Sequence, residues 1–236
     1  MRTLWQAVGF DLDFTLWDQD RFARSFFDAI AGEFGRRLGL GPGPVARALH
    51  AALDQLTLAH PALFDRALQQ LGAWDPRLVA ELVRRYHQHR PAAEPYPGVP
   101  ELLGRLRAGG FRLFLVTDGP GPTQRHKVAA LGLAAQFQAL VFTGELAEGQ
   151  AKPSPYPFRL ACQRLGVDAR QCVFVGDNPE RDVSGPRSLG MLTVGVGTGP
   201  FARMQPDEGP RAHLRVGPVA DLAQLLLPAA AARSRS

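Results

Sequence analysis

The chain has 236 residues, of which 45% are hydrophobic and 21% charged, and its formal net charge at pH 7 is +5. This length allows one or two domains, and the basic residues are scattered instead of forming a Lys/Arg-rich tract, so we expect no nucleic-acid partner. Because no apolar stretch approaches the roughly 20 residues of a membrane-spanning helix and the first residues do not resemble a signal peptide, we expect a cytoplasmic protein with no membrane partner.

The first part of the chain predicts one strand followed by a helical block. Residues 4–10 form an apolar run that is typical of a buried strand. From 21 to about 38, apolar residues recur every four positions, which indicates an amphipathic helix, and two or three further helical stretches follow. The proline-rich segment 91–97 ends the block as a stiff link. We therefore expect residues 19–93 to form an inserted helical domain.

After residue 94, short apolar strands alternate with helices. The predicted strands are 111–117, 139–143, 172–175, 192–196 and a short one near 213–217, and the predicted helices are about 98–109, 122–132, 155–166, 179–189 and 218–227. This alternation is typical of βαβ units. The sequence therefore predicts an α/β fold in which residues 1–18 and 94–236 form a doubly wound parallel sheet, with 228–236 as a disordered tail.

Cysteine and lysine are both rare in this chain. Cys162 and Cys172 are its only cysteines, which excludes a disulfide framework, and we expect both to be small buried side chains. Of the 27 basic residues, only Lys127 and Lys152 are lysines. A lysine in a chain that otherwise uses arginine indicates a need for a compact ammonium group, and the neighbouring motif makes Lys152 informative; the alternative is a surface lysine.

Four polar motifs lie at or near the ends of predicted strands. They contain, in chain order, Asp11 with Asp13, Thr117 with Asp118, Lys152, and Asp177 with Asp182. The carboxyl ends of parallel strands meet at one edge of the sheet, and α/β proteins bind their ligands there. We therefore expect the four motifs to converge in space although they are far apart in the sequence.

The pair Asp11 and Asp13 is central to the predicted chemistry. Residues two apart in an extended chain point the same way, so the two carboxylates are expected to lie close together, and the pKa of one is expected to rise unless a metal intervenes. A nucleophile and a general acid need that difference in protonation. An Asp-x-Asp pair alone is a weak signal, because strands often end in such pairs. The full set of motifs matches the needs of phosphoryl transfer, namely a carboxylate nucleophile, a proton donor, cations around the phosphoryl oxygens and a hard-metal site.

Taken together, the motifs resemble the haloacid dehalogenase superfamily of hydrolases, and the correspondence covers essentially the whole chain. It runs through Asp11-Leu12-Asp13-Phe14-Thr15, Thr117, Lys152-Pro153 and Gly176-Asp177 with Asp182. The resemblance implies a Rossmann-like core. The helical block 19–93 is similar to the small α-helical cap of that superfamily's C1-capped members.

The resemblance also implies a mechanism. Asp11 would be the nucleophile that attacks phosphorus and forms an aspartyl phosphate. Asp13 would protonate the leaving alkoxide and then deprotonate the water that hydrolyses the intermediate. The cofactor would be Mg²⁺, bound by Asp11, the main-chain carbonyl of Asp13, and Asp177. Thr117 and the catalytic Lys152 would hold the phosphoryl oxygens.

Three further positions qualify the resemblance. Asp182 would act from behind the metal ligands by orienting metal-bound waters and Lys152. Superfamily members often have Gly or Asp where this chain has Phe14, and often Asn where it has Asp118. We expect Phe14 to change only the packing beside the nucleophile. Asp118 is either a substrate contact or a turn residue that bonds nearby backbone.

The leading functional prediction is a Mg²⁺-dependent phosphomonoesterase that acts on a small soluble phosphate ester, as a monomer or homodimer. Alternatives are a phosphomutase, a haloacid dehalogenase and a non-catalytic phospho-ligand sensor. Asp13 argues against the dehalogenase, because a halide leaving group needs no proton. A sensor would have no need for both acids of the first motif. Trp17, Arg21 and Phe22 lie near that motif and are candidates to contact the leaving group. The alternative is that Phe22 belongs to the core of the helical block and Arg21 is exposed to solvent.

Overall fold

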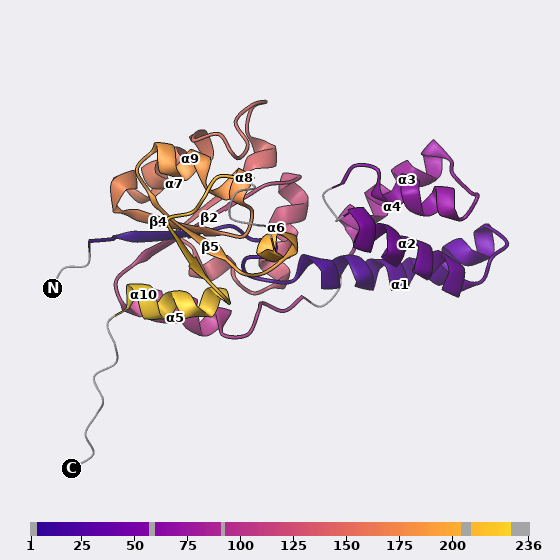
Figure 1. The fold of residues 1–236 in the computed structure, drawn as a ribbon, viewed down its shortest axis with the longest axis horizontal. Coiled ribbons are helices and arrows are strands. Elements are labelled where there is room, and N and C mark those ends of the chain that lie inside the picture. The colour runs from indigo at the N-terminus through magenta and orange to yellow at the C-terminus, as the bar shows by residue number, and fades with distance from the viewer. Residues whose placement is uncertain (1–3, 57–59, 91–92, 204–208, 228–236) are drawn as a thin grey trace, which may run out of the picture. The chain divides into compact units, whose positions relative to one another are not determined.

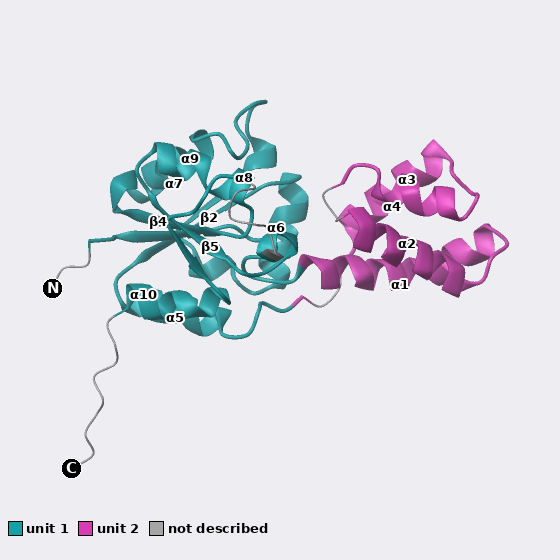
Figure 2. Ribbon diagram, viewed as in Figure 1, with its two compact units in different colours: residues 1–18, 94–236 teal, residues 19–93 magenta. Residues whose placement is uncertain are grey.

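The computed structural model of the chain describes residues 4–56, 60–90, 93–203 and 209–227. The chain divides into two compact units, residues 1–18 with 94–236, called unit 1, and residues 19–93, called unit 2 (Figure 2). The segment 228–236, predicted as a tail, lies outside the described residues. Within the described ranges, no helix combines the length and the apolar character that crossing a membrane requires.

Unit 1 is built on a parallel sheet of six strands (Figure 1). The strands are β1 (Ala7–Phe10), β2 (Arg112–Thr117), β3 (Ala139–Phe142), β4 (Cys172–Gly176), β5 (Leu192–Val196) and β6 (Leu214–Val216). Their order across the sheet is β3-β2-β1-β4-β5-β6, and every neighbouring pair is parallel. The predicted doubly wound α/β fold is confirmed, although the first strand begins later than predicted, at Ala7.

The strand register brings the polar motifs to one edge of the sheet. Phe10, the last residue of β1, lies opposite Leu115 of β2 and Val175 of β4. The strand order reverses at β1, because β2 and β3 lie on one side of it and β4, β5 and β6 on the other. Ligands of such sheets bind beyond the carboxyl ends of the strands, at the point where the order reverses. The residues that follow β1, β2 and β4 therefore share one binding edge.

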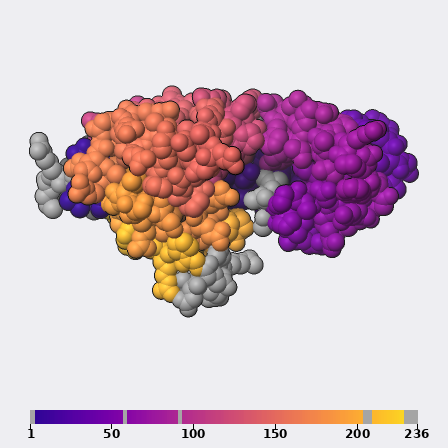
Figure 3. All heavy atoms as spheres, turned by 90° about the horizontal axis from the view of Figure 1, so that it is seen from above, coloured from indigo at the N-terminus to yellow at the C-terminus, as the bar shows by residue number. Residues whose placement is uncertain are grey.

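Helices cover both faces of the sheet. They are α5 (Val99–Ala108), α6 (Gly121–Ala130), α7 (Tyr156–Leu165), α8 (Pro179–Asp182), α9 (Ser184–Ser188) and α10 (Leu222–Leu226). Figure 1 shows α5 and α10 below the sheet and α7 and α9 above it. Seen from above, the salmon and orange atoms of that part of the chain lie on the visible surface of unit 1 (Figure 3). This double cover explains why all residues of β1 and β4 are buried and why both strands read as continuous apolar runs.

Two helices differ from the prediction. The helix predicted at 179–189 is instead two short helices, α8 and α9, separated at Val183. A continuous helix would need a hydrogen bond from residue 186 to the carbonyl of Asp182, but Pro186 has no N–H and its ring would clash with that carbonyl. The helix predicted at 218–227 consists of a 3₁₀ turn, Val219–Asp221, followed by the short α10.

Aromatic rings and the two cysteines fill the core between the sheet and α7. The ring of Phe174 contacts Phe114 and Phe158, with centroid distances of 6.1 and 4.7 Å. Cys162 and Cys172 belong to the same buried cluster and are free thiols. The prediction that both cysteines are small buried side chains is therefore confirmed.

Unit 2 consists of helices throughout its described residues. They are α1 (Gln19–Arg37), α2 (Pro42–Leu56), α3 (Leu63–Gln70) and α4 (Pro76–Gln88). The apolar stripe of α1 is buried, and its Phe26 ring contacts Phe64 and Tyr86. Asp75 begins α4 as an N-cap that accepts a hydrogen bond from the backbone N–H of Arg77, which satisfies one of the unpaired donors of the first turn.

The close packing of Gly9 against Phe114 generates a stability prediction. A Cβ atom at Gly9 would come within 2.2 Å of the Phe114 ring, so we expect Gly9→Ala to lower the free energy of unfolding by about 1–3 kcal/mol. The matched control is Gly104→Ala on the exposed face of α5, where a Cβ would meet no atom of the described residues within 4 Å. That change is expected to raise stability by about 1 kcal/mol. Urea unfolding of both variants gives the comparison, and equal stabilities would contradict the tight packing at Gly9.

Candidate active site

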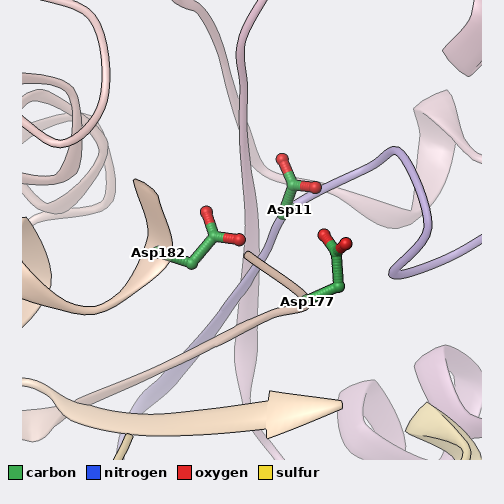
Figure 4. A group of neighbouring side chains, drawn as sticks. All are labelled: Asp11, Asp177 and Asp182. Atoms are coloured by element: carbon green, nitrogen blue, oxygen red, sulfur yellow. The ribbon is translucent and has the colours of Figure 1, made fainter. Parts of the chain in front are cut away.

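Three buried carboxylates meet at the carboxyl edge of the sheet. Asp11 directly follows β1, Asp177 directly follows β4, and Asp182 is the last residue of α8. One oxygen from each lies within 4.8 Å of the others, and the residues are only 6%, 8% and 3% exposed. Figure 4 shows the three side chains turned toward one another. The structure therefore brings the first and fourth motifs together.

The ammonium group of Lys152 joins two of these acids. Its Nζ donates to Asp11 Oδ1 at 2.6 Å and to Asp182 Oδ1 at 2.7 Å, and the lysine side chain is 3% exposed. Burial by itself lowers the pKa of Lys152, but the charges of Asp11 and Asp182 outweigh it and hold the pKa above its ordinary value. Lys152 is therefore a fixed positive charge beside Asp11.

The carboxyl groups are crowded enough to resist ionisation. Burial raises the pKa of Asp11 to about 7, although Lys152 counteracts it. Burial and the charge of Asp11 raise the pKa of Asp177 to about 9. Burial also raises the pKa of Asp182, with Lys152 again opposing the shift. One ammonium group therefore offsets only part of the cost of burying three acids together.

This donor set fits a hard divalent cation. Asp177 Oδ2 is buried and has no hydrogen-bond partner among the residues that the structure describes, and the three carboxylates offer only oxygen ligands, which suit Mg²⁺. The two oxygens of Asp182 are already used, because Oδ1 accepts from Lys152 and Oδ2 accepts from the backbone N–H of Asn178 at 3.1 Å. Asp11 and Asp177 are therefore the carboxylates best placed to hold a cation.

The absence of a side chain at Gly176 allows the carboxylate of Asp182 to lie against the end of β4. A Cβ atom at Gly176 would come within 2.3 Å of Asp182 Oδ2. Asn178 begins α8 as its N-cap, and its side chain accepts from the backbone N–H groups of Glu180 and Arg181. The glycine and the cap together place the carboxylate of Asp182 at the end of β4.

Asp13 has a different environment from Asp11. Lys127 Nζ donates to its Oδ1 and Oδ2 at 2.9 and 3.0 Å, Gln124 Nε2 donates to Oδ2 at 3.0 Å, and Trp17 Nε1 donates to Oδ1 at 2.8 Å. The pair that the sequence predicts to lie close together thus has separate partners, a lysine for each carboxylate.

Thr117 is linked to Asp13 through one side chain. It is the last residue of β2, it is buried, and its Oγ1 accepts a hydrogen bond from Gln124 Nε2 at 2.6 Å. Sequence reasoning missed both Gln124 and Lys127. The signal for Lys127 was present, because the rarity of lysine that made Lys152 informative applies equally to Lys127, and both lysines are buried in this site.

The side chain of Asp118 connects three segments. Its Oδ1 accepts from Thr143 Oγ1 at 2.6 Å and from the backbone N–H of Lys152 at 3.3 Å, and its Oδ2 accepts from Arg181 at 2.9 Å. Arg181 also donates to the carbonyl oxygen of Lys152. Asp118 therefore joins the loop after β2 to the loop that carries Lys152 and to α8.

The backbone of Phe14 adopts an unusual conformation. Its φ is +59°, a left-handed conformation that costs a residue with a Cβ about 1–2 kcal/mol. The hydroxyl of Thr198 donates a hydrogen bond to the carbonyl oxygen of Phe14. A Cβ atom added at Gly199 would come within 2.5 Å of the Cβ of Phe14. Phe14 therefore marks a tight turn of the backbone, a feature that the sequence analysis did not predict.

Trp17 and Arg21 lie in different units. Trp17 is 2% exposed, and isolated β-bridges join it to Asp13 and to Pro95 in unit 1. Arg21 is exposed on α1 in unit 2. Trp17 is therefore part of the structure that supports Asp13.

The chain is similar to known hydrolases over most of its length. A family model described as haloacid dehalogenase-like hydrolase matches residues 5–190. The chain is 35% identical over 207 residues to a glyceraldehyde 3-phosphate phosphatase of Methanopyrus kandleri, covering 85% of this chain and 88% of that protein. It is 35% identical over 165 residues to a phosphoserine phosphatase of Thermus thermophilus, covering 70% and 63%. The crystal structure of a HAD phosphatase from Thermococcus onnurineus has a TM-score of 0.64 at 25% identity, covering 94% of this chain and 97% of that one.

The raised pKa of Asp177 generates a prediction about stability in the presence of chelator. Between pH 3.8 and about 9 the folded chain keeps a proton that the unfolded chain releases, so this carboxyl lowers stability as pH rises. We expect Asp177→Asn to raise the free energy of unfolding at pH 7 in EDTA by about 1–3 kcal/mol, and its advantage to shrink toward acid pH.

The matched control for this change is Glu148→Gln, at an exposed acid outside the site. Urea unfolding across the pH range measures the difference between each variant and the parent protein. A less stable Asp177→Asn variant at pH 7, or the same gain from Glu148→Gln, would contradict the electrostatic account.

Proposed function

Because this chain belongs to the haloacid dehalogenase-like hydrolases, we propose that it is a Mg²⁺-dependent phosphomonoesterase that hydrolyses small phosphate esters through an aspartyl phosphate. The observation that carries the proposal is that the carboxylates of Asp11 and Asp13 have different hydrogen-bond partners. Asp11 is paired with Lys152, and Asp13 is paired with Lys127 and Gln124. Two carboxylates with different environments can serve as nucleophile and as proton carrier.

The names of the relatives support the class of substrate. Two proteins that are each 35% identical to this chain are named for glyceraldehyde 3-phosphate and phosphoserine, which are both small phosphate esters. We infer that this chain acts on a compound of similar size. A panel of small phosphate esters, assayed with Mg²⁺, would identify the substrate.

The proposed reaction has two steps. In the first, an Asp11 oxygen forms a bond to phosphorus while the bond from phosphorus to the leaving alkoxide breaks, and Asp13 gives that alkoxide a proton. In the second, a water molecule attacks phosphorus, Asp13 takes its proton, and inorganic phosphate leaves as the Asp11 carboxylate is restored. Thr117 and Lys152 hold the phosphoryl oxygens during both steps.

The metal and its surroundings complete the proposal. Asp11, Asp177 and the main-chain carbonyl of Asp13 would hold Mg²⁺, which when bound reduces the repulsion between an anionic nucleophile and a phosphate. Asp182 would position Lys152, since it accepts a hydrogen bond from the lysine Nζ at 2.7 Å. For Asp118 we favour a role in joining the loops around Lys152, because both of its oxygens accept hydrogen bonds from the protein.

We also propose that unit 2 is a cap of the C1 type. It is inserted after the first motif and before β2, and it consists of helices in its described residues. Such a cap would select the leaving group and restrict access of water. The main alternative is a phosphomutase. Such an enzyme forms the same aspartyl phosphate but returns the phosphoryl group to a second hydroxyl instead of to water. A dehalogenase is disfavoured because Asp13 is present and hydrogen-bonded in the site.

The proposal predicts that Asp11→Asn removes turnover without unfolding the protein. An amide keeps the shape of the side chain but cannot be the anionic nucleophile, so we expect kcat for small phosphate esters to fall roughly 1,000-fold or more. Release of inorganic phosphate measures turnover and also separates hydrolysis from mutase activity.

The matched control for this variant is Asp75→Asn. It makes the same chemical change at the N-cap of α4, where asparagine also caps well. Full activity is expected for the control. If Asp11→Asn stays folded and keeps more than about a tenth of kcat, Asp11 is not the nucleophile.

Activity is also expected to depend on a divalent cation. EDTA removes it, and Mg²⁺ restores it while Ca²⁺ does not, because Ca²⁺ accepts longer bonds and more ligands and would displace the nucleophile from its in-line position. Phosphate release with each ion gives the result. Mg²⁺ is further expected to raise the thermal midpoint of the parent protein more than that of Asp177→Asn. Full turnover in chelator would refute the metal requirement.

A further inference from the structure

Helix α6 presents two buried polar side chains to Asp13. Gln124 and Lys127 are three residues apart, so they lie on the same face of the helix. They are 2% and 4% exposed. Both donate hydrogen bonds to the carboxylate of Asp13, which lies 111 and 114 positions before them in the sequence. The motifs of the family resemblance include neither residue.

The amide of Gln124 connects Asp13 to Thr117. Its Nε2 lies 3.0 Å from Asp13 Oδ2 and 2.6 Å from Thr117 Oγ1. The reversed amide would place a carbonyl oxygen against the carboxylate, so the nitrogen is the group that faces Asp13. Because this nitrogen only donates, Thr117 Oγ1 accepts, which leaves the hydroxyl hydrogen of Thr117 to be donated to a third group. A phosphoryl oxygen is such an acceptor.

The ammonium group of Lys127 holds both oxygens of Asp13. The distances are 2.9 and 3.0 Å, and Trp17 donates to Oδ1 while its ring centroid lies 5.6 Å from the ammonium. Burying an ammonium group is costly unless it is paired, and replacing a buried ion pair as a whole by apolar side chains is often neutral or stabilising, so the pair of Lys127 with Asp13 is not explained by stability alone. The arrangement fixes the direction of the Asp13 carboxylate through three donors.

We propose that Lys127 and Gln124 are positioning residues that direct the carboxylate of Asp13 for proton transfer and, through Gln124, the hydroxyl of Thr117 for the phosphoryl group. This inference rests on the proposed function. It distinguishes two kinds of step. Proton transfer by Asp13 depends on both residues, whereas cleavage of an ester whose leaving group is already a stable anion does not need that proton transfer.

The test uses p-nitrophenyl phosphate with the full-length protein and Mg²⁺ under pre-steady-state conditions. Nitrophenolate is a stable anion, so its release reports formation of the aspartyl phosphate without a proton from Asp13. The later steady-state rate reports hydrolysis, which needs Asp13 to take a proton from water. For Lys127→Met we expect the first phase to slow by less than about tenfold and the steady state to fall about 100-fold. A burst of nitrophenolate equal to the enzyme concentration then appears, and the quenched protein carries a phosphoryl group.

The matched control is Arg125→Met on the same helix. Arg125 is exposed and paired with Glu145, so this change also removes one positive charge from α6 but not from the site. Both phases are expected to remain as in the parent protein. Because Lys127→Met leaves a carboxylate without its ammonium partner, Gln124→Met serves as a second variant that unpairs no buried charge. We expect it to show the same burst, with a steady-state loss of about tenfold and a higher KM.

The outcomes separate this inference from the proposed function. Equal losses in both phases for folded Lys127→Met and Gln124→Met variants, or no loss in either phase, would overturn the positioning role. If Asp11→Asn abolishes both phases in the same assay while Lys127→Met behaves as the parent protein, the proposed function stands and this inference fails. Turnover that survives Asp11→Asn would remove the proposed function itself.

Discussion

The burial of one ammonium group among three carboxyl groups is the constraint on which this site depends. Lys152 lies between Asp11 and Asp182, and without it these two buried carboxylates would lose the ammonium group that is paired with both of them. Even with it, the pKa of Asp177 is raised to about 9, chiefly by burial. A cation beside Asp177 would supply the missing positive charge, so the same crowding that destabilises the bare fold prepares a site for a metal.

The sheet makes this crowding possible. β1 and β4 are adjacent and parallel, so Asp11 and Asp177, which directly follow them, must lie side by side. The short α8 then returns the chain so that Asp182 lies against Gly176, where a Cβ atom would be in the way. Backbone pairing therefore sets the distance between the acids, and the side chains have little freedom to avoid one another.

Each of the two lysines of the chain is paired with one of the two acids in the first motif. Lys152 approaches Asp11 from the loop before α7, and Lys127 approaches Asp13 from α6. Residues only two apart in sequence thus lie in different electrostatic surroundings. A single pair of acids without these partners would share one environment, and a reaction that needs a nucleophile and a proton carrier would have no basis for telling them apart.

The sequence by itself determined the α/β alternation, the helical character of residues 19–93 and the convergence of Asp11, Lys152 and Asp177, because hydrophobic period and parallel strand ends follow from local pattern. Local pattern also misled where it ignored Pro186, which divides the predicted helix at 179–189. Only the tertiary structure decided the partners of Asp13 and Asp118. Apart from Trp17, which is four positions from Asp13, these partners are 25 to 114 positions away in sequence. Their contacts depend on which face α6 and α8 turn toward the sheet, which no short stretch of sequence encodes.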